Sequence, residues 1–208
     1  MDHFTHQQLK VDTIAVFVDS TSIAIPGSRK IFIASIMIDD SLPKAYVRFY
    51  LKENETWKLQ YSFEDVTWSG GAFLPEMTDF NNDGYKDLKY LKGTGARGGN
   101  GIYNLFIYDK KGDSLIYILN SNEYPNLYYN TETNSINSNF LTGGNETVFM
   151  RLDGKKLKRF ASIFQYDKKI TVTEFDSNGQ SKIINVDSSG KHDEFARFTN
   201  YKPLKVEK

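Results

Sequence analysis

Hydrophobic and polar residues alternate with a period of two along much of the chain, a pattern that predicts β-strands. Residues 57–63, with the sequence WKLQYSF, are an example and predict a half-buried strand. Continuous apolar runs at residues 13–19 and 31–39 predict strands that are buried more completely. We find no segment of ten or more residues with a convincing helical period.

Short turn sequences separate the predicted strands. Lys111-Gly112, Asp153-Gly154 and Asn178-Gly179 each lie between two such runs. Asp-Gly and Asn-Gly favour tight hairpins because both residues of the turn must take positive φ. Residues 124–145, which are rich in Asn, Ser and Thr, predict loops and extended pieces. We therefore expect an all-β fold of about a dozen strands, with antiparallel meanders and hairpins in an irregular propeller-like or barrel-like arrangement.

Length and composition limit the possible domain organisation, partners and site chemistry. The chain has 208 residues, which predicts a flexible tail at residues 1–10 and a single β domain at residues 11–208. Its 26 basic and 26 acidic residues cancel, which argues against a nucleic-acid partner. Cysteine is absent, which excludes a disulfide framework, a thiolate nucleophile and a zinc–cysteine site.

The cellular location is judged from the presence or absence of long apolar segments. We see no signal peptide and no apolar run long enough for a transmembrane segment. We expect a periplasmic or outer-membrane-attached protein whose export signal has been removed, and a cytoplasmic location stays open.

An acidic segment at residues 79–87, DFNNDGYKD, matches the pattern D-x-N-x-D-G-x-x-D. Calcium prefers roughly six to eight oxygen ligands, which short side chains at alternate positions of a tight turn can supply. The fifth position is followed by Gly84, which permits that turn. The expected metal ligands are Asp79, Asn81, Asp83, the backbone carbonyl of Tyr85, and Asp87.

The flanks of this segment indicate strands instead of the two helices of an EF-hand. An EF-hand also carries a bidentate Glu at its twelfth position, where this chain has Tyr90. We predict a structural calcium loop between β-strands. The alternative is a turn rich in Asn and Asp that binds no metal, because these residues are common in turns.

Glycines at residues 93–98, GTGARG, match the dinucleotide-binding pattern G-x-G-x-x-G. That site requires a helix directly after the glycines, so that the helix N-terminus faces the pyrophosphate. Residues 102–108 predict a strand instead. We therefore expect a surface loop with Arg97 at its tip.

The acidic segment, the Gly/Asn loop at residues 98–100 and the tyrosine-containing strand at residues 103–109 occur in a particular order. In this order they resemble a family of exported bacterial β-proteins that have propeller-like sheets around one calcium loop. Some of its members resemble periplasmic type I lysozyme inhibitors and act as immunity proteins against lysozyme-like toxins. The resemblance implies a calcium-stabilised binding protein, not an enzyme, with a lysozyme-like cell-wall hydrolase as its partner.

The lysozyme inhibitors insert a protruding S-G-x-x-Y loop into the enzyme. Residues 69–73, SGGAF, are the closest match, with Phe in place of Tyr, and residues 142–146 form a second candidate loop. The alternative for each loop is a glycine hairpin without a partner, which we favour for either loop taken alone. The candidate partner-binding residues are Ser69, Gly70 and Phe73 in the first loop, and Gly143, Gly144 and Asn145 in the second.

Two other functions stay open at this point. Aromatic residues such as Trp68 could stack on sugars, as in a carbohydrate- or protein-binding β-module of the cell envelope. Paired carboxylates such as Asp193-Glu194 could serve a glycan-active enzyme, which we favour least.

Overall fold

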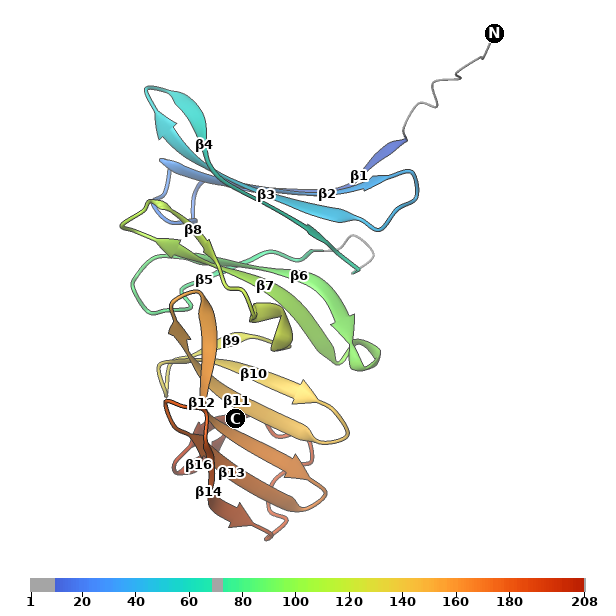
Figure 1. Ribbon diagram of the computed structural model, residues 1–208, viewed down its shortest axis with the longest axis vertical. Coiled ribbons are helices and arrows are strands. Elements are labelled where there is room, and N and C mark those ends of the chain that lie inside the picture. The colour runs from blue at the N-terminus through green and yellow to red at the C-terminus, as the bar shows by residue number, and fades with distance from the viewer. Residues whose placement is uncertain (1–9, 69–72, 208) are drawn as a thin grey trace.

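The computed structural model describes residues 10–68 and 73–207, which form a column of antiparallel β-sheets (Figure 1). In each sheet the strand order follows the order of the chain. The first sheet contains β1 (Val11–Asp19), β2 (Arg29–Ile38), β3 (Lys44–Glu53) and β4 (Thr56–Val66). The middle sheet contains β5 (Glu76–Thr78), β6 (Asp87–Gly95), β7 (Asn100–Asp109) and β8 (Ser114–Tyr117).

The third sheet is the largest and is followed by a small hairpin. It contains β9 (Tyr128–Asn130), β10 (Ser135–Leu141), β11 (Asn145–Asp153), β12 (Lys156–Tyr166), β13 (Lys169–Phe175) and β14 (Ser181–Asp187). The hairpin consists of β15 (Phe198–Tyr201) and β16 (Leu204–Val206). Two short 3-10 helices, η1 (Ala96–Gly98) and η2 (Ser121–Glu123), lie in connections.

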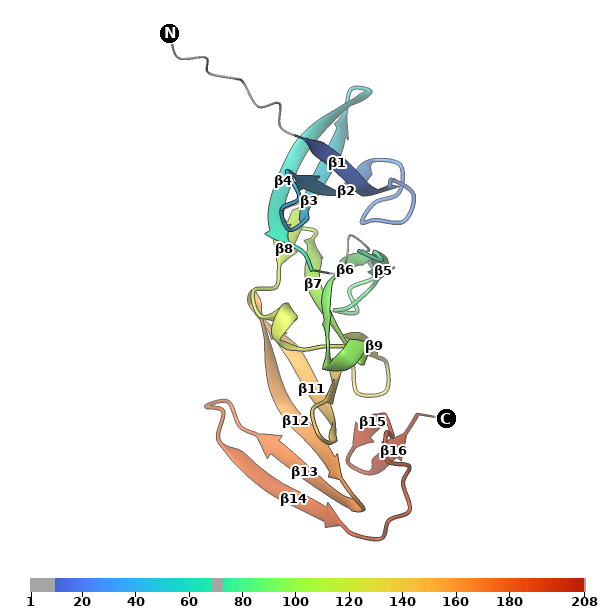
Figure 2. The same cartoon turned by 90° about the vertical axis from the view of Figure 1, so that its right-hand side faces the viewer.

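The predicted all-β class, made of antiparallel meanders and hairpins, is confirmed. The sheets pack one after another along the long axis, as the perpendicular view shows (Figure 2). Across the described residues they do not close into a barrel. Within the same residues, no helix is long and apolar enough to cross a membrane. The predicted tail at residues 1–10 lies outside the described residues except for Lys10.

The middle sheet is buried on both of its faces. Strand β7 shows why, because its apolar residues alternate between two cores. Phe106 and Tyr108 pack against the first sheet, whereas Leu105 and Ile107 pack against the third sheet. A continuous apolar run is typical of a strand that is covered on both sides.

Buried and half-buried polar side chains join the stacked sheets. The carboxylate of Asp65 on β4 lies 2.6 Å from Lys92 Nζ on β6 and accepts a 2.9 Å hydrogen bond from Asn104 on β7. Lys89 on β6 donates a 2.7 Å bond to the carbonyl of Leu127 near the third sheet. Each of these polar groups is satisfied, as burial between sheets requires.

Two local expectations need correction. The predicted alternation at residues 57–63 is interrupted by a β-bulge: Phe49 pairs with Tyr61, but the next residue, Tyr50, pairs with Leu59. The extra residue places Leu59 on the other face, where its side chain is exposed. In addition, the apolar run at residues 13–19, predicted to be buried more completely, lies in the edge strand β1, where Ile14, Val16 and Val18 are exposed. The extended pieces predicted within residues 124–145 are present as the strands β9 and β10. Their strand character was hidden by buried polar residues such as Asn137.

Truncation of Phe106 tests the role of the middle sheet. We expect Phe106→Ala to lower the free energy of unfolding by about 3–5 kcal/mol, because the ring is fully buried and leaves a cavity. Phe195→Ala, which removes an exposed ring, should change it by less than about 0.5 kcal/mol. Urea denaturation measures both, and equal effects would contradict the assigned core.

Candidate functional site

The segment at residues 79–87, which we call the acidic turn, connects β5 to β6. Gly84 has a φ of 88°, which allows the chain to reverse. Its N–H donates a 2.8 Å hydrogen bond to the carboxylate of Asp79, and the N–H of Tyr85 donates a 2.9 Å bond to Asp83. Asn81 donates a 3.0 Å bond to the same Asp83 carboxylate. The predicted turn between strands is therefore present.

Asp87 ties the acidic turn to the middle sheet. Its side chain is fully buried at the start of β6, and its two oxygens accept 2.8 Å hydrogen bonds from the backbone N–H groups of Phe80 and Tyr108. Burial, with a smaller contribution from the Asp83 and Asp79 carboxylates, raises the pKa of Asp87 to about 7 against the opposing effect of these two bonds. Asp87 thus connects the turn directly to β7.

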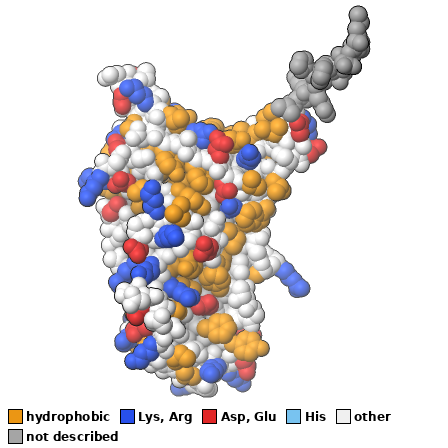
Figure 3. Space-filling view, viewed as in Figure 1, with side chains coloured by type: hydrophobic (Ala, Val, Ile, Leu, Met, Phe, Trp, Pro, Cys, Tyr) orange, Lys and Arg blue, Asp and Glu red, His pale blue; other side chains and the backbone are white. Residues whose placement is uncertain are grey.

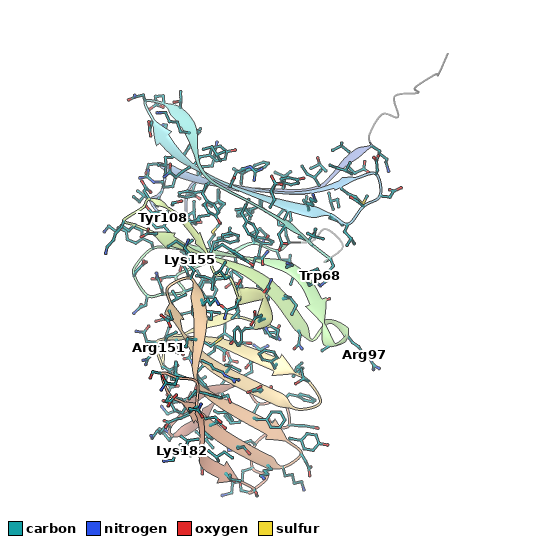
Figure 4. All side chains as sticks on the ribbon, in the orientation of Figure 1. Trp68, Arg97, Tyr108, Arg151, Lys155 and Lys182 are labelled. Atoms are coloured by element: carbon teal, nitrogen blue, oxygen red, sulfur yellow. The ribbon has the colours of Figure 1, made fainter. Side chains whose placement is uncertain are left out.

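Aromatic and charged side chains extend this connection to the first sheet. The ring of Tyr85 lies 5.5 Å from that of Tyr108, which is labelled in Figure 4. The hydroxyl of Tyr108 donates a 2.7 Å bond to Asp113, which also accepts a 2.7 Å bond from Arg29 on β2. Burial opposes ionisation of Asp113, but the bonds from Arg29 and Tyr108 outweigh it and hold its pKa below the ordinary value.

The acidic turn supplies ligand atoms of the type that calcium prefers. Asp79, Asn81 and Asp83 place carboxylate and amide oxygens on one turn. Both oxygens of Asp87 already accept N–H bonds, although a carboxylate has about four lone-pair sites and can share them. Among the described residues, no three acidic, His or Cys side chains converge into a preformed metal cluster. Calcium would therefore depend mainly on the turn itself.

Comparisons with known proteins identify a distant structural likeness but no family. No protein-family model matches the chain, and no curated protein matches it. A solved structure described as that of a Xanthomonas type IV secretion system related protein is similar to this chain. It is 13% identical with a TM-score of 0.45, covering 87% of this chain and 95% of the other. A likeness of this size supports no conclusion about function, so the resemblance to lysozyme inhibitors stays a prediction.

The first predicted partner loop is only partly described. Ser69 and Gly70 lie outside the described residues. Phe73 is 4% exposed and packs in the core between the first and middle sheets, and its carbonyl accepts a 2.7 Å bond from Leu91. Its side chain would have to leave this core to contact a partner.

The second predicted partner loop is an exposed turn between β10 and β11, at the same side of the molecule as the β6–β7 and β12–β13 turns (Figure 1). Gly143 lies at its tip with a φ of 72°. Asn145 has a different position, because its buried side chain donates a hydrogen bond to the carbonyl of Ala196. Gly143 is therefore exposed and Gly144 is half-buried, whereas Asn145 anchors the turn.

A groove of about 600 Å³ lies beside this turn, and no sequence pattern predicts it. Its lining includes Gly143, Gly144, Gln165, Tyr166, Glu194 and Phe195. Gln165 and Tyr166 lie at the end of β12 and the other residues lie in separate connections, and no sequence spacing relates them. Strand β15 begins at Phe198, so Phe195 precedes it and is exposed.

Removal of the Asp87 carboxylate tests its connecting role without metal. In the presence of a chelator, Asp87→Ala should lower the free energy of unfolding by about 2–5 kcal/mol, because two buried N–H groups lose their acceptor. Asp83→Ala, in the exposed part of the turn, should lower it by about 1 kcal/mol or less. If chemical denaturation shows the opposite order, Asp87 does not anchor the turn.

Proposed function

We propose that this chain is an exported, non-catalytic binding protein that calcium stabilises and that inhibits a lysozyme-like cell-wall hydrolase. The observation that supports binding is the exposed glycine turn at residues 142–144 beside an open groove. The class of partner is supported by the sequence resemblance of the acidic turn and the segment that follows it. We place the protein in the periplasm or attached to the outer membrane.

In this proposal, calcium stabilises the fold. The side chains of Asp79, Asn81 and Asp83 and the carbonyl of Tyr85 would hold the ion, with Asp87 as a shared ligand. A divalent cation would offset the repulsion among the three carboxylates, which lie close enough to influence one another. Because Asp87 also binds the N–H of Tyr108, the ion would stabilise β7 through the turn.

The glycine turn is suited to enter a cleft. Gly143 carries no side chain, and a Cβ atom built there meets no other atom within 4 Å, so the tip is free on its outer side. The base of the turn is fixed by the hydrogen bond from Asn145 to Ala196. A loop that is fixed before binding loses less conformational entropy on association.

A glycan-binding function is the second candidate. Trp68 is half exposed, and its ring lies directly against Gly93 of β6 with Lys92 Nζ 5.1 Å from the ring centre. An aromatic ring that is held at the surface can stack on a sugar. Loss of glycan binding in Trp68→Ala, without inhibition of any hydrolase, would favour this candidate.

Calcium should raise the melting temperature, and a chelator should reverse the increase. At a calcium concentration of 100 times Kd, we expect an increase of about 5–10 °C, which corresponds to about 2.7 kcal/mol for a chain of this size. Asp83→Asn should remove most of the increase, whereas Asp40→Asn in the β2–β3 turn should retain it. A wild-type melting curve that does not respond to calcium would show that the acidic turn binds no metal.

Cell-wall lysis assays with a panel of lysozymes test the proposed partner. We expect stoichiometric inhibition of at least one enzyme by the purified protein. Thr142→Arg, which adds bulk to the glycine turn, should weaken inhibition at least about tenfold, equivalent to about 1.4 kcal/mol. Ser177→Arg, in the β13–β14 turn, is the matched control and should inhibit normally. No change in any lysis rate at micromolar protein would contradict the proposal.

A further inference from the structure

We infer that the groove beside the glycine turn binds a basic side chain, arginine or lysine, of a partner polypeptide. This inference rests on the proposed binding function and assigns it a site and a chemistry. The groove is formed by the tip of the β6–β7 connection, the β10–β11 turn, the β12–β13 turn and residues 193–196.

One side of the groove is fixed by two asparagines. Asn100 at the start of β7 donates a 3.1 Å bond to the carbonyl of Leu141 and accepts a 3.0 Å bond from its N–H. Asn126 donates 2.9 Å bonds to the carbonyls of Gly99 and Asn139. These bonds hold the β6–β7 tip against the end of β10, so this wall is in place before any partner binds.

The opposite side is fixed by two further side-chain amides. Gln165 donates a 2.8 Å bond from Nε2 to the carbonyl of Asp193, and Asn145 donates to the carbonyl of Ala196. Both residues belong to the third sheet, and both hold residues 193–196 beside it. Phe195 is therefore positioned over the groove by its bonded neighbours.

Gln165 also leaves an acceptor without a partner. Its side chain is 2% exposed and lines the groove, and its Oε1 receives no hydrogen bond from the described residues. A buried acceptor without a donor is unfavourable, and a donor supplied by a ligand would satisfy it. Because Nε2 is already used in the bond to Asp193, Oε1 is the atom of this side chain that a donor entering the groove would satisfy.

The charge and the aromatic rings indicate which donor fits. The charged residues that line the groove, Asp167 and Glu194, are both acidic. Tyr166 and Phe195 also line it and are 63% and 69% exposed. Carboxylates bind guanidinium or ammonium groups by charge-assisted hydrogen bonds, and aromatic faces attract the same cations. An arginine or lysine side chain therefore matches the carboxylates, the aromatic rings and the Gln165 acceptor of the groove.

The surroundings make this side of the molecule suitable for a polypeptide. In Figure 3, hydrophobic side chains gather toward the right, the side on which the β6–β7 tip lies. Many Lys and Arg side chains lie on the left. Figure 4 places Arg151, Lys155 and Lys182 on that opposite side, while Arg97 points outward from the β6–β7 tip. A partner that presents a basic residue would meet apolar surface around it.

A titration with matched peptides, followed by nuclear magnetic resonance, tests this inference. Acetyl-Gly-Arg-Gly-amide should shift the signals of Tyr166, Phe195 and the Gln165 side-chain amide in a saturable manner. The same peptide with citrulline, which has the shape of arginine without its charge, should bind at least about tenfold more weakly. Added salt should weaken only the arginine peptide, because the carboxylates are at the surface.

Two pairs of variants supply the controls. Asp167 and Asp40 both lie in exposed turns at positive φ, a conformation that Asn tolerates, so Asp167→Asn should weaken arginine binding and Asp40→Asn should not. Likewise, Tyr166→Ala should weaken it, whereas Ile183→Ala, at an equally exposed apolar position on β14, should not.

Three results would overturn the assignment: equal binding of the citrulline peptide, no saturable shift at the groove, or binding of a chito-oligosaccharide there in place of the arginine peptide. If the arginine peptide fails to bind but a lysozyme is still inhibited, the groove chemistry is wrong and the proposed function stands. If the peptide binds but no lysozyme is inhibited, the groove assignment is supported and the proposed partner class fails.

Discussion

The structure depends on a middle sheet that cannot leave either face in contact with water. Leu105 and Phe106 point to opposite sides of β7, and both side chains are fully buried. Each large apolar side chain that is removed from water contributes about 1.5–3 kcal/mol, so one covering layer would leave half of this contribution unused. The first and third sheets cover the two faces, which explains the column of sheets.

Burial of the middle sheet also decides where its polar groups can lie. Asp87, Lys89 and Asn104 are buried within it, and each side chain binds a group on a neighbouring segment. As a result, polar side chains that would be costly in an apolar core fix connections instead. Asp87 holds the acidic turn, while Asn100 and Asn126 hold the β6–β7 tip at the groove. The rigid sheet thus positions both the candidate metal site and the candidate binding site.

Features that depend on neighbouring residues in the chain could be predicted from the sequence. Period-two alternation and the turns at Gly112, Gly154 and Gly179 predicted hairpins that the structure contains, and the acidic turn lies between strands as expected. Features that depend on distant contacts could not be predicted. The bulge that exposes Leu59 arises from pairing with β3, and β10 is stabilised by buried hydrogen bonds of its polar side chains.

The groove could not be predicted for the same reason. Tyr166 at the end of β12 and Phe195 in the segment before β15 become neighbours only after the third sheet has formed and residues 193–196 have been fixed to it. The one local signal was an aromatic residue next to a charged residue at each position, Tyr166 before Asp167 and Phe195 after Glu194. Such a signal indicates exposure but does not identify a partner.

Hydrogen exchange of the backbone amides tests most directly whether the doubly covered middle sheet fixes the acidic turn. The N–H groups of Phe80 and Tyr108 both bind the Asp87 carboxylate, so they should exchange as slowly as the N–H of Leu105 in the centre of β7. Exchange of the Phe80 amide at the rate of exposed turns such as residues 142–144, while Leu105 stays protected, would contradict this account.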